Sequence, residues 1–362
     1  MNDKIKMHKK HLTYMLEDGI IQIGKISNNI TNIIKIQEER AMTKRERVIA
    51  AIEGRETDAV PCGFSLHFPK EQAYGAAAVD THIKFFEETD TDILKIMNEN
   101  LVPYMGEINK GSDYSLVREM SMKDQFMQDQ VALVKSILER CDKDAFTLGT
   151  LHGITASSIH PLEKMDPSYT YDGVREKLCR LLHEDRDTVL AGMQRIADVM
   201  CELAKTYIEL GVDGVYYAAL GGETRFFTDE EFEAYIKPFD LQIMKAVKDA
   251  GGYCFLHICK DQLNMERYKD YGQYADVVNW GVYEAPYSLE EGRKLFPNTA
   301  IMGGLPNRHG VLVDGPAEAV KAEVHNVVNS FGKKGFILGA DCTLATEQDM
   351  GLLKAAVEAA RE

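Results

Sequence analysis

One histidine and two cysteines are the residues of this chain with the clearest potential for chemistry. His257 and Cys259 lie in the segment GYCFLHICKD, and Cys342 lies in GFILGADCTLATEQ. Both segments contain a short apolar run typical of a buried strand, and residues two apart on a strand point the same way. A neutral imidazole and two thiolates suit Zn²⁺ and leave one tetrahedral position open. Because structural zinc sites usually use four protein ligands, three ligands at strand ends favour a catalytic site.

Eight short apolar runs are the predicted strands that would position these ligands. They span residues 60–68, 91–100, 145–153, 211–220, 252–259, 275–281, 299–305 and 335–342. Segments with apolar residues three and four apart, as on one face of a helix, lie between most of them. This alternation predicts a (β/α)8 TIM-type barrel. An open doubly wound sheet is the alternative, but no G-x-G-x-x-G follows the first strand and no P-loop is present.

The ends of two predicted helices are marked by capping boxes. Thr43 with Glu46 opens a helix over residues 43–54, and Thr228 with Glu231 opens another that ends at the glycines before the fifth strand. Pro238 should kink or split the second helix.

The chain is expected to divide into two parts. Residues 42–362 hold the predicted barrel domain, which ends in a helix from Thr346. Residues 1–41 are slightly basic and have isoleucines at helix-like spacings, interrupted by asparagines. A short helix, a partner-binding arm and an extension without function are the alternatives for this N-terminal extension.

Composition limits the classes of partner. The 362 residues carry a formal charge of −15, and the pI is near 5.2, which disfavours nucleic acid and anionic membranes. We find no apolar run long enough to cross a bilayer and no signal peptide, so a cytoplasmic location is expected. Seven cysteines, an odd number, favour reduced thiols over a disulfide framework.

In a barrel, catalytic groups gather at the carboxyl ends of the strands. Polar or aromatic residues at these ends are the candidates for substrate binding, with a hydrogen-bonded rim or core role as the alternative for each. They are His67, Asn98, His152, Tyr217, Trp280 and Asn307. Glu223, in GGETRFF after the fourth strand, is the candidate for a catalytic carboxylate, as a fourth zinc ligand or beside the ligands. Its alternative is a loop salt bridge with Arg225 or a neighbour.

From about residue 43 to the end, the chain resembles the uroporphyrinogen decarboxylase superfamily. The likeness lies in TKRERVIAAIEGRETDAVP, GVDGVYYAALGGETRFFTDEEFEAYIKPF, ADVVNWGVYEAPYSLEEGRKLFPNTAIMGGLPN and FILGADCTLATEQDMGLLKAAVEAARE. The resemblance implies a distorted (β/α)8 barrel with its active site in the cleft at the strand ends. The superfamily contains cofactor-free decarboxylases and zinc-dependent methyltransferases that work with corrinoid proteins.

Two motifs place the resemblance with the methyltransferases. The decarboxylases carry R-Q-A-G-R-Y after the first strand, whose arginines hold substrate carboxylates, whereas this chain reads SLHFPKEQAYG there, without an arginine. They also use a histidine near the last strand, where this chain has GADC. The methyltransferases are known by H-x-C followed far downstream by Cys, which His257, Cys259 and Cys342 match. The resemblance therefore implies that these three residues bind zinc.

The implied reaction is methyl transfer through the cobalt of a corrinoid. Zinc would either lower the pKa of a thiol acceptor or act as a Lewis acid on the heteroatom of a methylated substrate. The chain has no complete corrinoid-binding D-x-H-x-x-G motif; the nearest string, DTHIKF at residues 80–85, lacks the glycine. We therefore expect the corrinoid to arrive on a separate protein that docks over the barrel mouth.

Removal of a methyl group from a small O-, S- or N-methyl donor is the favoured direction. Methylation of a thiol by a methyl-corrinoid is the closest alternative. A cofactor-free decarboxylase of the uroporphyrinogen type and a non-catalytic module that binds corrinoid proteins are the further alternatives. Metal content and a decarboxylation assay distinguish among them.

Overall fold

The computed structural model describes residues 41–162, 170–285 and 287–362. The chain separates into two compact units, Met1–Met42 and Thr43–Glu362. The predicted N-terminal extension, with its possible helix, lies outside the described residues except for Ala41. All the strands that the structure describes belong to the larger unit.

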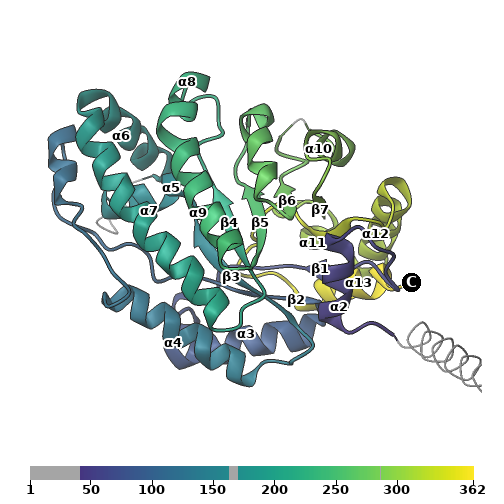
Figure 1. Cartoon of the computed structure of the whole chain (residues 1–362). Helices are drawn as coiled ribbons and strands as arrows, with labels where there is room; N and C mark the ends of the chain where they lie inside the picture. Colours follow the sequence, from purple (N-terminus) through teal and green to yellow (C-terminus); the bar gives the residue numbers. More distant parts are fainter. Residues whose placement is uncertain (1–40, 163–169, 286) are drawn as a thin grey trace, which may run out of the picture. The chain divides into compact units, whose positions relative to one another are not determined.

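Eight parallel strands form the centre of the larger unit, and helices surround them (Figure 1). The strands are β1 (Cys62–Gly63), β2 (Ile93–Ile96), β3 (Phe146–His152), β4 (Gly214–Ala219), β5 (Tyr253–Ile258), β6 (Val277–Trp280), β7 (Ala300–Leu305) and β8 (Phe336–Ala340). Their order in the sheet is β1-β8-β7-β6-β5-β4-β3-β2. Each predicted run contains one of these strands, and the predicted (β/α)8 barrel is confirmed.

The barrel has a seam between β1 and β2, which form no ladder with each other. Asp92, just before β2, bridges the seam. Its backbone N–H donates to the carbonyl of Cys62 at 2.9 Å, and its carboxylate accepts from the N–H of Cys62 at 2.8 Å. The guanidinium of Arg47 pairs with the same carboxylate from α2 (Lys44–Ile52). Two hydrogen bonds between Asp92 and Cys62 therefore connect the strands where the ladder is missing, and the ion pair with Arg47 holds the Asp92 carboxylate.

The remaining helices follow the strands in alternation. They are α3 (Gly75–Thr89), α4 (Gln125–Arg140), α5 (Ile154–Ile159), α6 (Tyr171–Glu184), α7 (Arg186–Glu209), α8 (Asp229–Glu231), α9 (Lys237–Asp249), α10 (Leu289–Leu295), α11 (Val311–Asp314), α12 (Ala317–Phe331) and α13 (Met350–Ala360).

Local sequence signals explain several helix ends. Both predicted capping boxes form, at Thr43 and at Thr228. Pro238 lies in the first turn of α9, and a π-helical turn, Phe232–Ile236, separates α9 from α8, as the split predicted at this proline requires. The last helix begins later than predicted, because the side chain of Asp349 caps it in place of Thr346.

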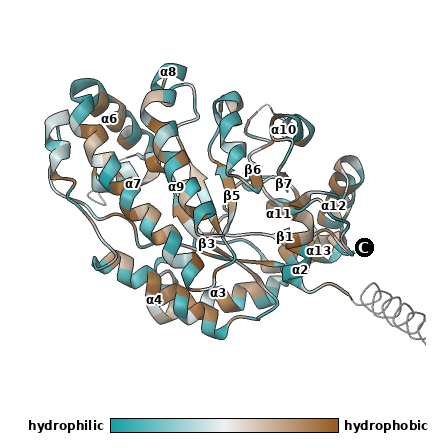
Figure 2. Ribbon diagram, in the orientation of Figure 1, coloured by the Kyte–Doolittle hydropathy of each residue, from teal (hydrophilic) through white to brown (hydrophobic). Residues whose placement is uncertain are grey.

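Buried apolar side chains form two clusters, one inside the barrel and one between the strands and the helices. Figure 2 shows hydrophobic residues on the strands and along the surrounding helices. The inner cluster fills the barrel with residues such as Phe146, Phe255 and Ile337, and Val48 and Ala51 of α2 pack against it. Because Arg45 of α2 binds Asp144 and Asp213 just before β3 and β4, this helix covers the amino ends of the strands. The carboxyl ends remain available for a site.

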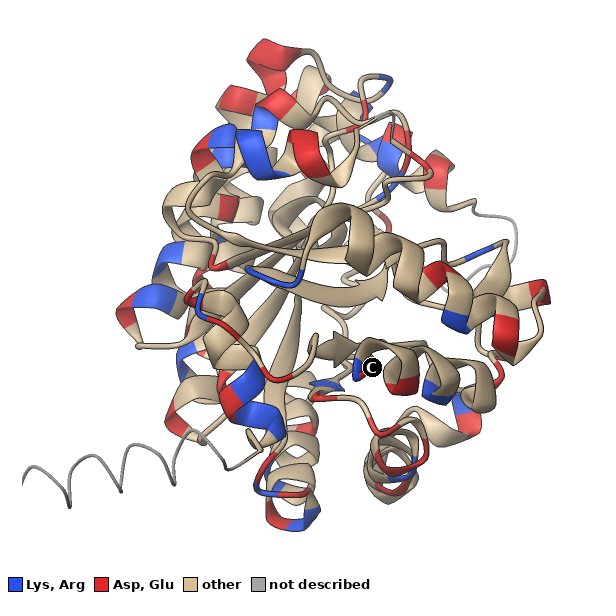
Figure 3. Ribbon diagram, turned by 90° about the vertical axis from the view of Figure 1, so that its right-hand side faces the viewer, with Lys and Arg blue, Asp and Glu red and all other residues tan. Residues whose placement is uncertain are grey.

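Charged residues of both signs lie mainly on the surrounding helices and loops (Figure 3). Within the described ranges, we find no helix with the length and apolar character needed to cross a membrane.

Candidate metal centre and its cavity

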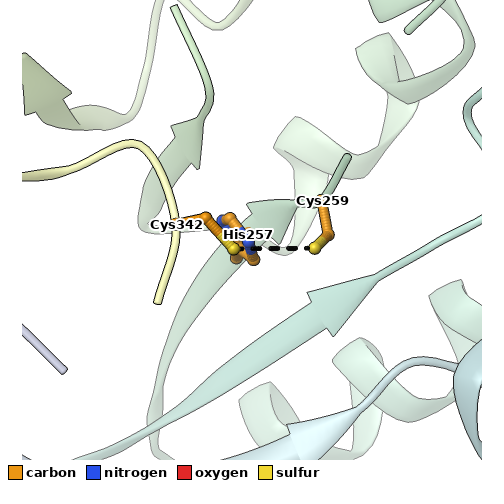
Figure 4. Close-up of side chains that lie close together, drawn as sticks. All are labelled: His257, Cys259 and Cys342. Carbon is orange, nitrogen blue, oxygen red and sulfur yellow. Dashed lines mark hydrogen bonds between the residues drawn. The ribbon is translucent and has the colours of Figure 1, made fainter. Parts of the chain in front are cut away.

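His257, Cys259 and Cys342 meet at the carboxyl ends of β5 and β8 (Figure 4). His257 lies in β5, Cys259 is the first residue after β5, and Cys342 is the second residue after β8. One ligand atom of each residue lies within 4.8 Å of the others, and the two sulfurs are 3.8 Å apart. Parallel strands bring these ends together although 83 residues separate the cysteines in the chain. The predicted ligands are therefore neighbours in space.

Asn279 of β6 fixes the orientation of the His257 ring. The amide nitrogen of Asn279 donates to the carbonyls of Met302 and Ala340, at 3.0 and 3.2 Å, which leaves its oxygen as the acceptor. Nδ1 of His257 lies 2.6 Å from that oxygen and must carry the proton. In the neutral imidazole, Nε2 is then the nitrogen with the free lone pair, and it is buried without a hydrogen-bond partner among the described residues. This is the form in which histidine binds a metal, with its other nitrogen held by a hydrogen bond.

The two thiols interact with each other. A hydrogen bond from Cys259 to the sulfur of Cys342 holds the pKa of Cys342 well below its usual value. The same hydrogen bond, together with burial, raises the pKa of Cys259. Metal binding would remove the protons of both thiols, because the thiolate is the form that binds a metal ion.

The donor set fits zinc. An imidazole nitrogen and two sulfurs are preferred zinc ligands, and the unpaired Nε2 is a buried polar atom that a metal would satisfy. Within the described part of the chain, no fourth His, Cys, Asp or Glu joins this group. Three protein ligands leave a coordination position for a substrate.

Glu223 does not join the ligands. Its buried carboxylate pairs with the guanidinium of Arg175 in α6 and accepts from the N–H of Gly221 at 3.1 Å. The predicted role as a fourth ligand is therefore not supported by its position. The alternative, a loop salt bridge, is the observed one, although with Arg175 and not with Arg225.

A cavity of about 310 Å³ lies at the strand ends and includes the three ligands in its wall. His67 and His152, two of the predicted substrate-binding residues, line it. Nδ1 of His67 is 2.6 Å from Glu99. Burial opposes ionisation of Glu99, but this hydrogen bond and the electrostatic interactions with His67, His152 and Lys95 together hold its pKa below its usual value. Burial lowers the pKa of His152 to about 3, so its imidazole is neutral.

Two of the predicted substrate-binding residues, Tyr217 and Trp280, do not line the cavity, because successive side chains of a strand point to opposite faces. Tyr217 points outward, where its hydroxyl donates to Asp240 of α9. Trp280 is fully buried outside the barrel, donates to the carbonyl of Tyr287 and packs against Gly292 of α10. A Cβ atom on that glycine would lie 1.9 Å from the indole, so Gly292 provides the space for the ring. Both side chains serve the packing of helices on the barrel.

The two predicted asparagines also have local roles. Asn98 is buried, and its oxygen accepts from the N–H of Asn100 at 3.1 Å. Asn307 donates to the carbonyl of Thr343 at 3.1 Å and so supports the loop that carries Cys342. Neither lines the cavity.

Lys95 and Tyr216 line the cavity and were not predicted. Tyr216 precedes Tyr217 on β4, and its hydroxyl donates to the oxygen of Asn279 at 2.9 Å. The ammonium of Lys95, on β2, lies 3.6 Å from the centre of the Tyr216 ring, and burial lowers its pKa to about 8. The sequence did contain a signal for Lys95. Successive side chains of a strand point to opposite faces, and a lysine within an apolar strand therefore faces either solvent or a functional interior.

Comparisons with known proteins agree with this architecture. The chain is similar to a methyltransferase from Methanosarcina mazei, with a TM-score of 0.67 and 15% identity over 88% of this chain and 98% of that one. It is also similar to a B12-independent methionine synthase from Shewanella sp. W3-18-1 in complex with selenomethionine, with a TM-score of 0.55 and 11% identity over 83% and 97% of the two chains. At these identities the likeness shows the fold alone.

No curated protein gives a significant match to the chain. The model of the uroporphyrinogen decarboxylase (URO-D) family matches residues 167–362, more than half of the 362 residues. This match includes all three converging side chains and strands β4 to β8. The chain therefore belongs to the uroporphyrinogen decarboxylase family.

Proposed function

We propose that this protein is a zinc-dependent methyltransferase that moves a methyl group between a small methylated substrate and the cobalt of a corrinoid protein. The observation that carries the proposal is the convergence of one unprotonated imidazole nitrogen and two sulfurs on the wall of a cavity. The fold shared with the Methanosarcina methyltransferase supports it.

His257, Cys259 and Cys342 would hold the zinc ion. Bound there, zinc supplies a Lewis acid for the heteroatom that carries the methyl group, or lowers the pKa of a thiol substrate. Asn279 keeps Nε2 of His257 directed at the ligand position, and Asn307 supports the backbone beside Cys342. The apolar interior beneath the ligands excludes water from one side of the site.

The hydrogen-bonded pair of His67 and Glu99 supplies the acid–base group in this proposal. The oxygen or nitrogen from which the methyl group is removed keeps the electron pair of the broken bond and needs a proton. This pair lies on the same cavity wall as Lys95 and His152. His152 itself is neutral because burial keeps its pKa near 3. His67 is half-exposed, so it can exchange protons with solvent.

The corrinoid would arrive on a partner protein that docks over the barrel mouth. Six large apolar or aromatic side chains are well exposed in the described chain: Tyr74, Tyr104, Leu116, Tyr171, Tyr283 and Val313. Each lies between the end of a strand and the long helix that follows, or in the first turn of that helix. Aromatic residues of this kind are enriched in protein interfaces, so exposed ones in the segments that follow the strands support docking on that side of the barrel.

The direction of transfer depends on the substrate. The same three ligands would serve demethylation of a donor and methylation of a thiol, since both need one open coordination position. A decarboxylase of the uroporphyrinogen type finds less support, because Arg308 contributes the only guanidinium among the described residues that line the cavity.

Metal analysis tests the proposal first. We expect about one zinc per wild-type chain and almost none in His257→Ala, Cys259→Ala or Cys342→Ala. Cys141→Ala is the matched control, because this buried thiol lies at the end of α4, outside the metal group. A Cys342→Ala protein that retained full zinc would overturn the ligand assignment.

A donor and acceptor screen tests the reaction. The zinc-loaded protein is mixed with a reduced corrinoid protein and O-, S- or N-methyl donors, and the absorption spectrum reports methylation of cobalt. The reverse screen uses a methylated corrinoid protein and thiols. Transfer in neither direction, combined with release of CO₂ from a carboxylic acid by the metal-free protein, would favour the decarboxylase.

A further inference from the structure

Lys95 is a lysine inside the barrel without an acidic partner. Its ammonium donates to the hydroxyl of Ser65 at 3.1 Å and lies 3.6 Å from the centre of the Tyr216 ring. Within the described chain, no Asp or Glu oxygen forms an ion pair with it, since the nearby Glu99 pairs with His67. A cation that is largely removed from solvent normally has a charged partner, so an anion from outside the chain would complete this environment.

The cavity around Lys95 is rich in positive charge. Among the described residues that line the cavity are the cationic residues Lys95, Lys260 and Arg308. Glu99 is the only Asp or Glu among them. The chain as a whole has the opposite balance, with a formal charge of −15. An excess of cations in the cavity of an acidic protein favours entry of an anionic ligand.

Thr150 provides a second, independent indication of a ligand. It lies on β3, lines the cavity and is only 3% exposed, yet its hydroxyl has no hydrogen-bond partner among the described residues. The register pairs Thr150 with Tyr216 on β4, whose ring contacts the ammonium of Lys95. A buried hydroxyl without a partner is costly unless a ligand or water satisfies it.

We propose that Lys95 determines substrate specificity by binding a monoanionic head group, a carboxylate or a sulfonate, on the substrate. The hydroxyl of Thr150 would donate a second hydrogen bond to the same group. The methyl-bearing heteroatom would then face His257, Cys259 and Cys342, which line the same cavity. This inference rests on the proposed function, because it assigns the substrate class to the proposed site.

A different role for Lys95 would be to balance the charge of the two sulfurs. In that case its removal would change zinc retention and would leave the choice between charged and neutral ligands unaltered. The two roles therefore predict different measurements.

The test uses calorimetric titration of the zinc-loaded protein without any corrinoid protein. The probes are methylthioacetate, methylthiomethanesulfonate and the neutral methylthioacetamide. We expect one or both anions to bind at least about tenfold more tightly than the amide, the strength typical of a charged hydrogen bond. The preferred anion identifies the head group.

Lys95→Met removes the charge and keeps most of the side-chain volume. We expect it to abolish the preference for the anion, to leave amide binding unchanged and to retain about one zinc per chain. Thr150→Val should weaken anion binding by about fivefold. Lys84→Met, on the exposed face of α3, is the control for the change in net charge and should bind all probes as wild type does.

Equal wild-type affinities for the anions and the amide would overturn the inference even if Lys95→Met fails to fold. Loss of zinc from Lys95→Met with anion preference retained would assign Lys95 to charge balance instead. Failure of the methyl-transfer screen leaves the binding preference measurable, so it would count against the proposed reaction alone.

Discussion

Two polar networks lie on opposite faces of the same strands, and they differ in completeness. Outside the barrel, Asp240 accepts hydrogen bonds from Tyr217, from Tyr271 at 2.9 Å and from the N–H of Ile154 at 3.1 Å. Inside, Asn279 satisfies Tyr216 and Nδ1 of His257, but Nε2 of that histidine has no partner among the described residues.

The difference distinguishes polar groups that stabilise the fold from polar groups that are available to bind a ligand. The outer network joins β4 to α9 and η5 (Met265–Gln273), and both carboxylate oxygens of Asp240 accept hydrogen bonds in it. The inner network ends in an atom with an unused lone pair beside two sulfurs. Since buried polar groups are nearly always satisfied, an unsatisfied one in a cavity wall indicates a binding function.

Removal of the outer carboxylate should have the largest effect on stability. Asp240→Ala leaves the buried hydroxyls of Tyr217 and Tyr271 without their acceptor and leaves the N–H of Ile154 with the Tyr217 hydroxyl alone. We expect a loss of about 3 kcal/mol in the free energy of unfolding. Urea denaturation measures this loss. Zinc affinity should remain that of wild type, and a parallel loss of zinc would show that the two networks are coupled.

The outer network should also make stability depend on pH. Burial raises the pKa of Asp240 to about 6, above that of an aspartate in an unfolded chain. The folded state therefore binds this proton more tightly, and its stabilisation is complete below about pH 4 and is lost as the pH rises through about 6. The contribution amounts to as much as about 3 kcal/mol.

Comparison with Asp240→Asn isolates this contribution. The stability of wild type minus that of the variant should fall between about pH 4 and pH 7, because the asparagine does not titrate. Denaturation curves recorded in steps of pH measure the difference. A constant difference over this range would contradict the raised pKa.

The inner network should control metal affinity. Asn279→Ala frees the His257 ring to rotate or change its tautomer, and we expect zinc affinity to fall by about ten- to a hundredfold. Competition with a chromogenic chelator measures it. Asp240→Ala is the matched control on the outer face, and equal zinc affinities of the two variants would remove the distinction between the networks.

The adjacent tyrosines of β4 allow the two networks to be compared by removing one hydroxyl from each, and we expect the smallest effects from these variants. Tyr217→Phe should lower stability by about 1 kcal/mol because Asp240 loses one donor, whereas zinc affinity should not change. Tyr216→Phe should affect zinc affinity by less than about tenfold, since Asn279 still holds His257. Denaturation and chelator competition on both variants check the pair.

The sequence alone determined the architecture and the identity of the three converging residues. Apolar runs that alternate with helical segments indicated eight parallel strands, and residues two apart on β5 had to share a face. Capping boxes located helix starts at Thr43 and Thr228, since these signals are local in the chain.

Only the tertiary structure decided which strand-end residues face the cavity. Tyr216 and Tyr217 have the same side chain and neighbouring positions, and the pleat of β4 places one inside the barrel and the other against α9. Glu223 and Trp280 found partners in Arg175 and Gly292 that are distant or inconspicuous in the sequence. The surroundings of the Lys95 ammonium come from Ser65 and Tyr216, which belong to other segments of the chain. Such partners are fixed by packing and not by spacing along the chain.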